Sequence, residues 1–201
     1  VEFNNKLISE FPNIGSTILT ATDNSVGVDI ETSFAFTGFY KDALGITAPD
    51  KRIRSTLGVT TYLEMNSIVQ KYAGQKMVLK FNNDIGGSGD DDINVYTGMI
   101  IRNQAMKTVV TPTGSVFSGG TDLFAAGESR VLQRSKNIEN IETNEQIGVH
   151  SWGEGKKSAK DIPYTDASHR KQATYFKTML GDKGVDFYLF TLDSAPFDGE
   201  H

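Results

Sequence analysis

Ser118 lies in a glycine-rich segment, Thr113-Gly-Ser-Val-Phe-Ser-Gly-Gly-Thr, in which residue types and spacing suit acyl chemistry. The pattern predicts a serine on a strand-to-helix turn, which presents its hydroxyl at the edge of a sheet. The backbone N–H of Gly119 would then face an oxyanion that develops near the helix N-terminus. Gly86 and Gly87, in a second glycine-rich turn, let a substrate approach the backbone because they have no side chains. These residues predict nucleophilic attack on a carbonyl.

A serine nucleophile needs a base within hydrogen-bond reach, and His150 is the candidate. It ends a predicted strand over residues 146–150. Each assignment has a structural alternative. The structural alternative for Ser118 is a helix N-cap, a position that serine favours. His150 would fit as a core histidine at a strand end, and Gly86 and Gly87 would fit as a tight turn.

Composition excludes several classes of function. The chain has 201 residues, a formal net charge of −5 and no cysteine. An acidic chain without a dense basic run does not suit a nucleic-acid binder, and the lack of cysteine excludes disulfides and thiolate sites. No apolar run approaches the length of a membrane span, so a soluble protein without a membrane span is expected. The acidic run at residues 90–92 is explained by a helix N-terminus rather than by a metal site.

Apolar periodicity and turn residues predict strands that alternate with helices. The first fifty residues read as a β layer, and residues 85–89 as a glycine-rich turn. A polar surface excursion is expected over residues 134–145. The predicted strands are 26–30, 33–40, 77–81, 108–111, 130–133 and 146–150, and the predicted helices are 60–72, 92–106, 118–126, 166–180 and 185–192. This alternation favours a mostly parallel sheet with ligand sites beyond the carboxyl ends of its strands.

The motifs in this order resemble those of the ClpP/crotonase superfamily, and of its ClpP-type serine proteases in particular. The resemblance covers roughly residues 75–195. The chain also resembles divergent bacterial ClpP-like proteins that are described as periplasmic. It implies an α/β fold built as a spiral of ββα units, with residues 1–50 as a β-rich extension and 51–201 as the core with C-terminal handle helices. The matching segments are Gly114-x3-Ser118-x-Gly120-x6-Gly127, Leu79 to Ser88, Ile147-Gly-Val-His150, and Gly155 with Ala159-Lys-Asp-Ile162.

The resemblance also implies roles. Ser118 attacks an acyl carbonyl and His150 accepts its proton. The N–H groups of Gly119 and of Gly87 or Gly86 hold the oxyanion. The third catalytic position falls on Asp198, with Glu200 as the next choice. The sequence departs from the family in two places. It has Ile85 where the family has proline, and the interval from Ser118 to His150 is longer than in the family.

The predicted activity is therefore that of a serine peptidase or related acyl hydrolase, with a peptide or acyl substrate and without a cofactor or metal. Two alternatives stay open: an inactive ClpP-like assembly or binding module, and a crotonase-type acyl-CoA enzyme. The resemblance implies a homo-oligomer formed through the handle region, for which an exposed cluster of Tyr175, Phe176 and Met179 would be suitable. His169 is expected on the solvated face of the same helix. The compartment, exported or cytoplasmic, stays undecided, with exported preferred.

Overall fold

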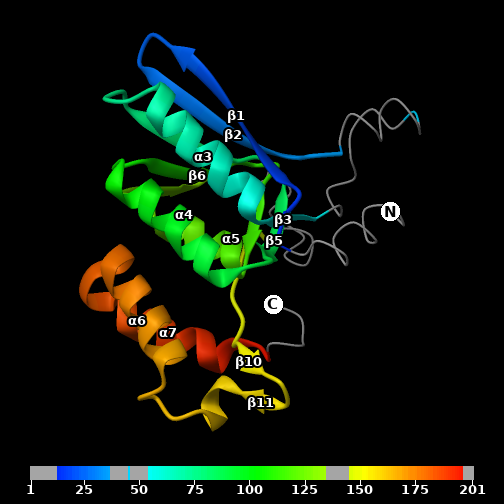
Figure 1. Ribbon diagram of the computed structural model, residues 1–201, viewed down its shortest axis with the longest axis vertical. Coiled ribbons are helices and arrows are strands. Elements are labelled where there is room, and N and C mark those ends of the chain that lie inside the picture. The colour runs from blue at the N-terminus through cyan, green and yellow to red at the C-terminus, as the bar shows by residue number, and fades with distance from the viewer. Residues whose placement is uncertain (1–12, 37–44, 46–53, 135–144, 197–201) are drawn as a thin grey trace. The chain divides into compact units, whose positions relative to one another are not determined.

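The computed structural model describes residues 13–36, 45, 54–134 and 145–196. The chain divides into two compact units, residues 1–146 and 147–201. Figure 1 shows the elements of both. The predicted boundary at residue 50 falls within residues 46–53, outside the described part of the chain.

The first unit is a succession of ββα units, three of them among the described residues. A strand, β1 (Thr17–Asn24), precedes them and another, β8 (Ser129–Leu132), follows them. The first ββα unit comprises β2 (Gly27–Phe34), β3 (Ser55–Leu57) and α3 (Val59–Lys71). The second ββα unit comprises β4 (Met77–Phe81), β5 (Asp84–Ser88) and α4 (Asp91–Asn103). The third ββα unit comprises β6 (Lys107–Val110), β7 (Ser115–Phe117) and α5 (Gly119–Ala125).

The two strands of each ββα unit enter different sheets. The first strands form a sheet in the order β1-β2-β4-β6-β8, in which β1 and β2 are an antiparallel hairpin and the other pairs are parallel. The second strands, β3, β5 and β7, lie parallel in a second sheet. The fold is thus the predicted α/β arrangement, a mostly parallel spiral of ββα units with an N-terminal β hairpin.

Alternating apolar residues explain why β2 and β4 lie together in the first sheet. Ile30 pairs in register with Leu79, and both side chains are buried. On the opposite face of the same strands, Lys80 forms an ion pair with Asp29, with Nζ 3.0 Å from Oδ2. A slip of one residue would exchange these two faces, so the hydrophobic pattern determines the register.

The helices of the first unit pack beside one another, α3 next to α4 and α4 next to α5 (Figure 1). Helix α4 begins at Asp90, whose side chain accepts hydrogen bonds from the backbone N–H groups of Asp92 and Ile93. The acidic run therefore caps a helix, as predicted. Within the described ranges, no group of three acidic or histidine side chains could hold a metal ion.

Two sequence predictions for the strands were wrong in detail. The predicted strands 26–30 and 33–40 are one strand, β2, and β1 was missed; residues 37–44 lie outside the described part. Only Thr17 and Leu19 of β1 are buried, so its apolar signal is weak. The predicted turn over residues 85–89 is largely strand β5. Glycines disfavour strands intrinsically, and here parallel neighbours on both sides override that preference.

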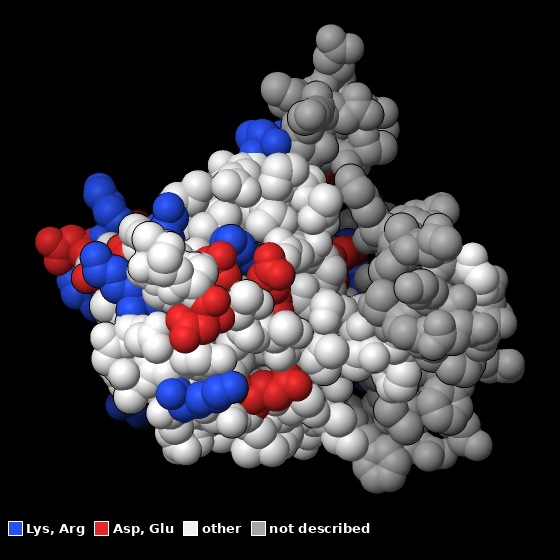
Figure 2. All heavy atoms as spheres, turned by 90° about the horizontal axis from the view of Figure 1, so that it is seen from above, with Lys and Arg blue, Asp and Glu red and all other residues white. Residues whose placement is uncertain are grey.

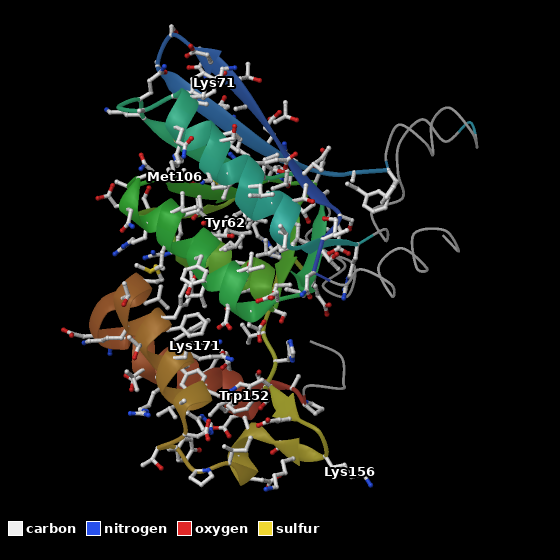
Figure 3. The ribbon with its side chains drawn as sticks, viewed as in Figure 1. Tyr62, Lys71, Met106, Trp152, Lys156 and Lys171 are labelled. Atoms are coloured by element: carbon white, nitrogen blue, oxygen red, sulfur yellow. The ribbon has the colours of Figure 1, made fainter. Side chains whose placement is uncertain are left out.

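The second unit contains short strands followed by two helices. Its elements are β9 (Ile147–Gly148), the hairpin of β10 (Gly153–Glu154) and β11 (Lys157–Ser158), two 3-10 turns (Ala159–Asp161 and Gly181–Lys183), α6 (Ala167–Leu180) and α7 (Gly184–Ser194). Both helices agree with the prediction. Lys156 points outward at the turn of the hairpin (Figure 3), as a solvated loop residue does. The predicted strand 146–150 ends at Gly148, so His150 lies in a loop.

The cluster expected to be exposed on α6 is instead the core of the second unit. Tyr175, Phe176 and Met179 are all buried, and Phe176 packs against Phe187 of α7 with ring centroids 5.0 Å apart. Tyr175 and Phe176 meet edge to face, with ring centroids 5.5 Å apart. These three residues therefore give no support to an oligomer interface, and the homo-oligomer stays a prediction without structural evidence.

His169 is likewise buried rather than solvated, with 1% of its surface exposed. Its Nε2 lies 2.9 Å from the Ala159 carbonyl oxygen and 3.2 Å from that of Ile162. A carbonyl can only accept, so Nε2 carries the proton and Nδ1 accepts from the Tyr188 hydroxyl at 2.6 Å. The indole N–H of Trp152, labelled in Figure 3, donates to the same hydroxyl at 2.9 Å.

Replacement of His169 by alanine is expected to destabilise the second unit by roughly 3 to 4 kcal/mol. The change leaves buried polar groups unpaired and opens a cavity beside Trp152, whose ring centroid lies 4.9 Å from that of His169. Trp152 is the only tryptophan, so its fluorescence during denaturant unfolding reports on this unit. Arg170→Ala, an exposed neighbour on α6, should change stability by less than about 0.5 kcal/mol. Equal effects of the two variants would contradict the prediction.

No helix of the described residues is long and apolar enough to cross a membrane. Among the described residues on the face drawn in Figure 2, Lys and Arg side chains are interspersed with Asp and Glu and form no patch of one sign.

Candidate functional site

Strands β5 and β7 place the two glycine-rich segments side by side. The strands are parallel, with Asp84 opposite Ser115 and Ile85 opposite Val116. Ser118 follows β7 directly and precedes α5. Parallel strands bring their carboxyl ends to the same edge of a sheet, and this explains why segments some thirty residues apart in the chain meet.

Ser118 has a backbone conformation that L-residues rarely adopt, with φ +52° and ψ −119°. Among the described non-glycine residues, only Ala105 also has a positive φ. Such strain costs about 1 to 3 kcal/mol and is concentrated at functional sites. Although Ser118 occupies the N-cap position of α5, its side chain makes no capping hydrogen bond. The capping alternative therefore does not account for this serine.

Glycines allow the two segments to approach each other closely. A Cβ atom on Gly87 would lie 3.6 Å from Ser118 Cβ and 3.7 Å from Ser118 Oγ, in van der Waals contact. A Cβ on Gly119 would lie only 2.9 Å from the backbone nitrogen of Ser88, and one on Gly120 would lie 3.1 Å from a methyl carbon of Ile85. Side chains at residues 119 and 120 would therefore push α5 away from β5.

Gly86 and Gly87 lie in β5 beyond the residues that pair with β7. The described pairing of β7 with β5 extends to Ile85, whereas β5 continues beside β3, where Thr56 lies opposite Gly87. Beyond Ile85, the chain after β7 turns into α5 instead of continuing the ladder.

Asn94 links α4 to this turn and carries an unsatisfied polar atom. Its side-chain Nδ2 donates to the Gly119 carbonyl oxygen at 3.1 Å. Its Oδ1 is buried without a hydrogen-bond partner, alone in this respect among the side-chain atoms of the described residues. A buried acceptor without a donor costs about 1 to 3 kcal/mol and calls for an explanation. Its place beside Gly119 makes it part of the candidate site.

Asp122 is a second feature that the sequence analysis missed. It lies in the first turn of α5, and its backbone N–H donates to the Ser118 carbonyl oxygen at 3.1 Å. Burial, with a further contribution from the charge of Asp91, raises the pKa of the Asp122 carboxyl to about 7. An aspartate in the first helical turn looks in sequence like a response to the helix dipole, so no sequence signal revealed this shift.

Arg54 is a third residue that the sequence analysis missed. It lies beside both glycine-rich segments of the site. Its guanidinium carbon is 4.5 Å from the ring centroid of Phe117, which directly precedes Ser118. Its Cδ would be 3.1 Å from a Cβ atom on Gly86. Its Nε donates to Asp84 Oδ2 at 3.0 Å. A single arginine carries no sequence motif, so only the fold could reveal this position.

His150 belongs to the second unit. Its Nδ1 lies 2.6 Å from the carbonyl oxygen of Ser151, so Nδ1 carries the proton and the lone pair is on Nε2. Ser151 is buried, and its own N–H donates to the Ala195 carbonyl oxygen at 2.7 Å. The loop thus holds the imidazole in the tautomer that a general base requires. Asp198 and Glu200, the predicted third position and its substitute, lie outside the described residues.

Solved structures with a fold similar to this chain include one described as an enoyl-CoA hydratase. No protein-family model matches the chain, and no curated protein matches it. An enoyl-CoA hydratase from Shewanella pealeana has a similar structure, with 13% sequence identity and a TM-score of 0.35. The likeness covers 62% of this chain and 49% of the hydratase, so the chain spans about half of the length of that protein.

Proposed function

We propose that this chain is a serine hydrolase that cleaves acyl substrates through an acyl-enzyme, with Ser118 as nucleophile and His150 as its base. The observation that carries the proposal is the conformation of Ser118. A strained serine on a strand-to-helix turn, without a capping bond and beside a glycine backbone, is the arrangement of an exposed nucleophile. A structural serine at a helix start has no need of such strain.

The reaction would proceed in two acyl transfers. Ser118 Oγ attacks the carbonyl carbon while its proton passes to His150 Nε2, and a tetrahedral oxyanion forms. The N–H of Gly119 and that of Gly87 or Gly86 stabilise this oxyanion. The intermediate collapses, and the leaving group departs with the proton from His150. Water then attacks the acyl-enzyme by the same route and releases the acid and the free serine.

The Ser151 carbonyl supports a serine–histidine dyad. It already accepts the Nδ1 proton of His150, which is the bond that an aspartate makes in the triad template. Asp198 therefore stays a prediction, and the dyad does not depend on it. Peptides, esters and thioesters are all acyl substrates for this mechanism.

Labelling with a fluorophosphonate probe tests the proposal. The probe is expected to form a covalent adduct at Ser118, identified by mass spectrometry of the digested protein, because an activated serine reacts readily. Ser118→Ala should abolish the adduct, and His150→Gln should slow labelling by about 100-fold or more. Ser129→Ala, an exposed serine on β8, should label like the unchanged protein.

Two results would count against the proposal. An adduct that persists in Ser118→Ala would assign the nucleophile elsewhere. No adduct in the unchanged protein would favour a binding module, or a crotonase-type acyl-CoA enzyme that uses the backbone N–H groups without a serine nucleophile.

A further inference from the structure

We infer that Arg54 is a specificity-determining residue that binds a carboxylate of the substrate beside Ser118. The inference rests on the proposed function for the reaction, but its evidence is the placement of Arg54 itself. Every distance that supports it lies within the first unit. It adds a substrate class to the proposed function: acyl compounds with a negatively charged group near the reacting carbonyl.

The position of Arg54 is held from two sides. Its Nε donates to Oδ2 of Asp84, while Oδ1 of the same carboxylate accepts from the Ser115 hydroxyl at 3.0 Å. Asp84 is itself nearly buried, with 11% of its side chain exposed. The guanidinium also lies over the Phe117 ring, a contact that favours arginine over lysine. The side chain is therefore preorganised.

Within the described residues, Arg54 is bound by Asp84 through Nε, which leaves its two terminal nitrogens for another ligand. In the described part of the chain, Asp84 is its one hydrogen-bonding partner. The Arg54 side chain is 50% exposed. The two terminal nitrogens of a guanidinium match the two oxygens of a carboxylate, and this bidentate pairing is stronger than neutral hydrogen bonds. An arginine held only for stability would gain more from a bidentate contact with Asp84 itself.

The site of attack lies close to this charge. Phe117 immediately precedes Ser118 in the chain, and Gly86 immediately precedes Gly87, where an added Cβ would lie 3.7 Å from Ser118 Oγ. A substrate carbonyl at Ser118 would thus place a carboxylate a few bonds away within reach of Arg54. An acidic side chain or a free carboxyl terminus next to the scissile bond has this chemistry.

Binding to the Ser118→Ala protein tests the inference without any reaction. The probes are N-acetylglutamate amide and its neutral isostere N-acetylglutamine amide, with the side-chain Nε–H signal of Arg54 followed by NMR. The glutamate compound is expected to shift this signal and to bind about tenfold more tightly than the glutamine compound. Arg54→Gln should remove the difference, and Arg54→Lys should reduce it several-fold. Lys80→Gln, which removes an equal charge from the ion pair with Asp29, should leave it unchanged.

Three outcomes would overturn the inference: equal binding of the two probes, a preference that survives in Arg54→Gln, or a stronger shift of the Arg54 signal with inorganic phosphate than with the glutamate compound. Thermal unfolding confirms that each variant is folded before its binding is compared. Because Ser118 is absent, these results are independent of fluorophosphonate labelling. Failure of the proposed hydrolase activity and failure of carboxylate recognition are thereby distinguished.

Discussion

Replacement of Ser118 by alanine is expected to lower the turnover of an activated acyl ester by at least about a thousandfold, with little change in stability. Loss of the nucleophile of a serine hydrolase removes the covalent route and leaves only what the oxyanion site and substrate binding contribute. Alanine keeps the strained backbone at φ +52°, so the free energy of unfolding should change by less than about 1 kcal/mol.

The variant Ser118→Gly distinguishes the effect of backbone strain on stability from the effect of the hydroxyl group on activity. Glycine adopts this conformation without a steric penalty but loses more entropy on folding, so the glycine variant should exceed the alanine variant in stability by about 1 kcal/mol. Both variants should be inactive. Denaturant unfolding and ester hydrolysis, measured on the same preparations, give the two quantities.

Ala105→Gly is the matched control, since Ala105 is the other described non-glycine residue with a positive φ. It should gain stability in the same way and retain full activity. Hydrolysis that survives in Ser118→Ala would refute the assignment of the nucleophile. If Ser118→Gly were less stable than Ser118→Ala, the backbone at this residue would not be strained, and the main support for the proposed function would be lost.

The second large expected effect is a dependence of the folding stability on pH, caused by Asp122. The folded state raises the pKa of this carboxyl to about 7 from an ordinary value of 3.8, so the folded protein binds the proton more tightly than the unfolded chain does. The contribution to stability is complete below about pH 4 and is lost as the pH rises to about 7. The loss amounts to at most about 4 kcal/mol, at 1.36 kcal/mol for each unit of pKa.

Asp122→Asn should remove most of this pH dependence. The amide cannot ionise, so the variant should match the unchanged protein near pH 4 and exceed it in stability at pH 8. Asp91→Asn should weaken the dependence, because the charge of Asp91 is the second cause of the shift. A smaller slope should survive in Asp122→Asn, since burial also raises the pKa of Glu64.

Urea unfolding followed by circular dichroism between pH 4 and pH 8 gives the measurement, and amide exchange in α4 and α5 assigns the effect to the first unit. Equal slopes in the unchanged protein and in Asp122→Asn would contradict the prediction. Stability that rises with pH over this range would show that the carboxyl is stabilised in its charged form.

The sequence determined the class of fold and the strand-to-helix turn at Ser118. Alternating apolar residues such as Ile30 and Leu79 specify strands by a local pattern, and the amphipathic stretches after them specify helices. Ser118 with the glycines around it is also a local signal, because a strained strand-to-helix turn demands small residues in consecutive positions. The capping role of Asp90 was predictable for the same reason.

The tertiary structure alone decided which distant residues meet. Strands β3 and β7 are too short for a periodic signal, and β5 is too rich in glycine, so neighbouring strands rather than propensity make them strands. His169 reads in sequence as a polar helix residue, and its burial depends on hydrogen bonds to residues before and after it in the chain. The pKa of Asp122 and the place of Arg54 beside Phe117 likewise result from long-range packing, which no local pattern encodes.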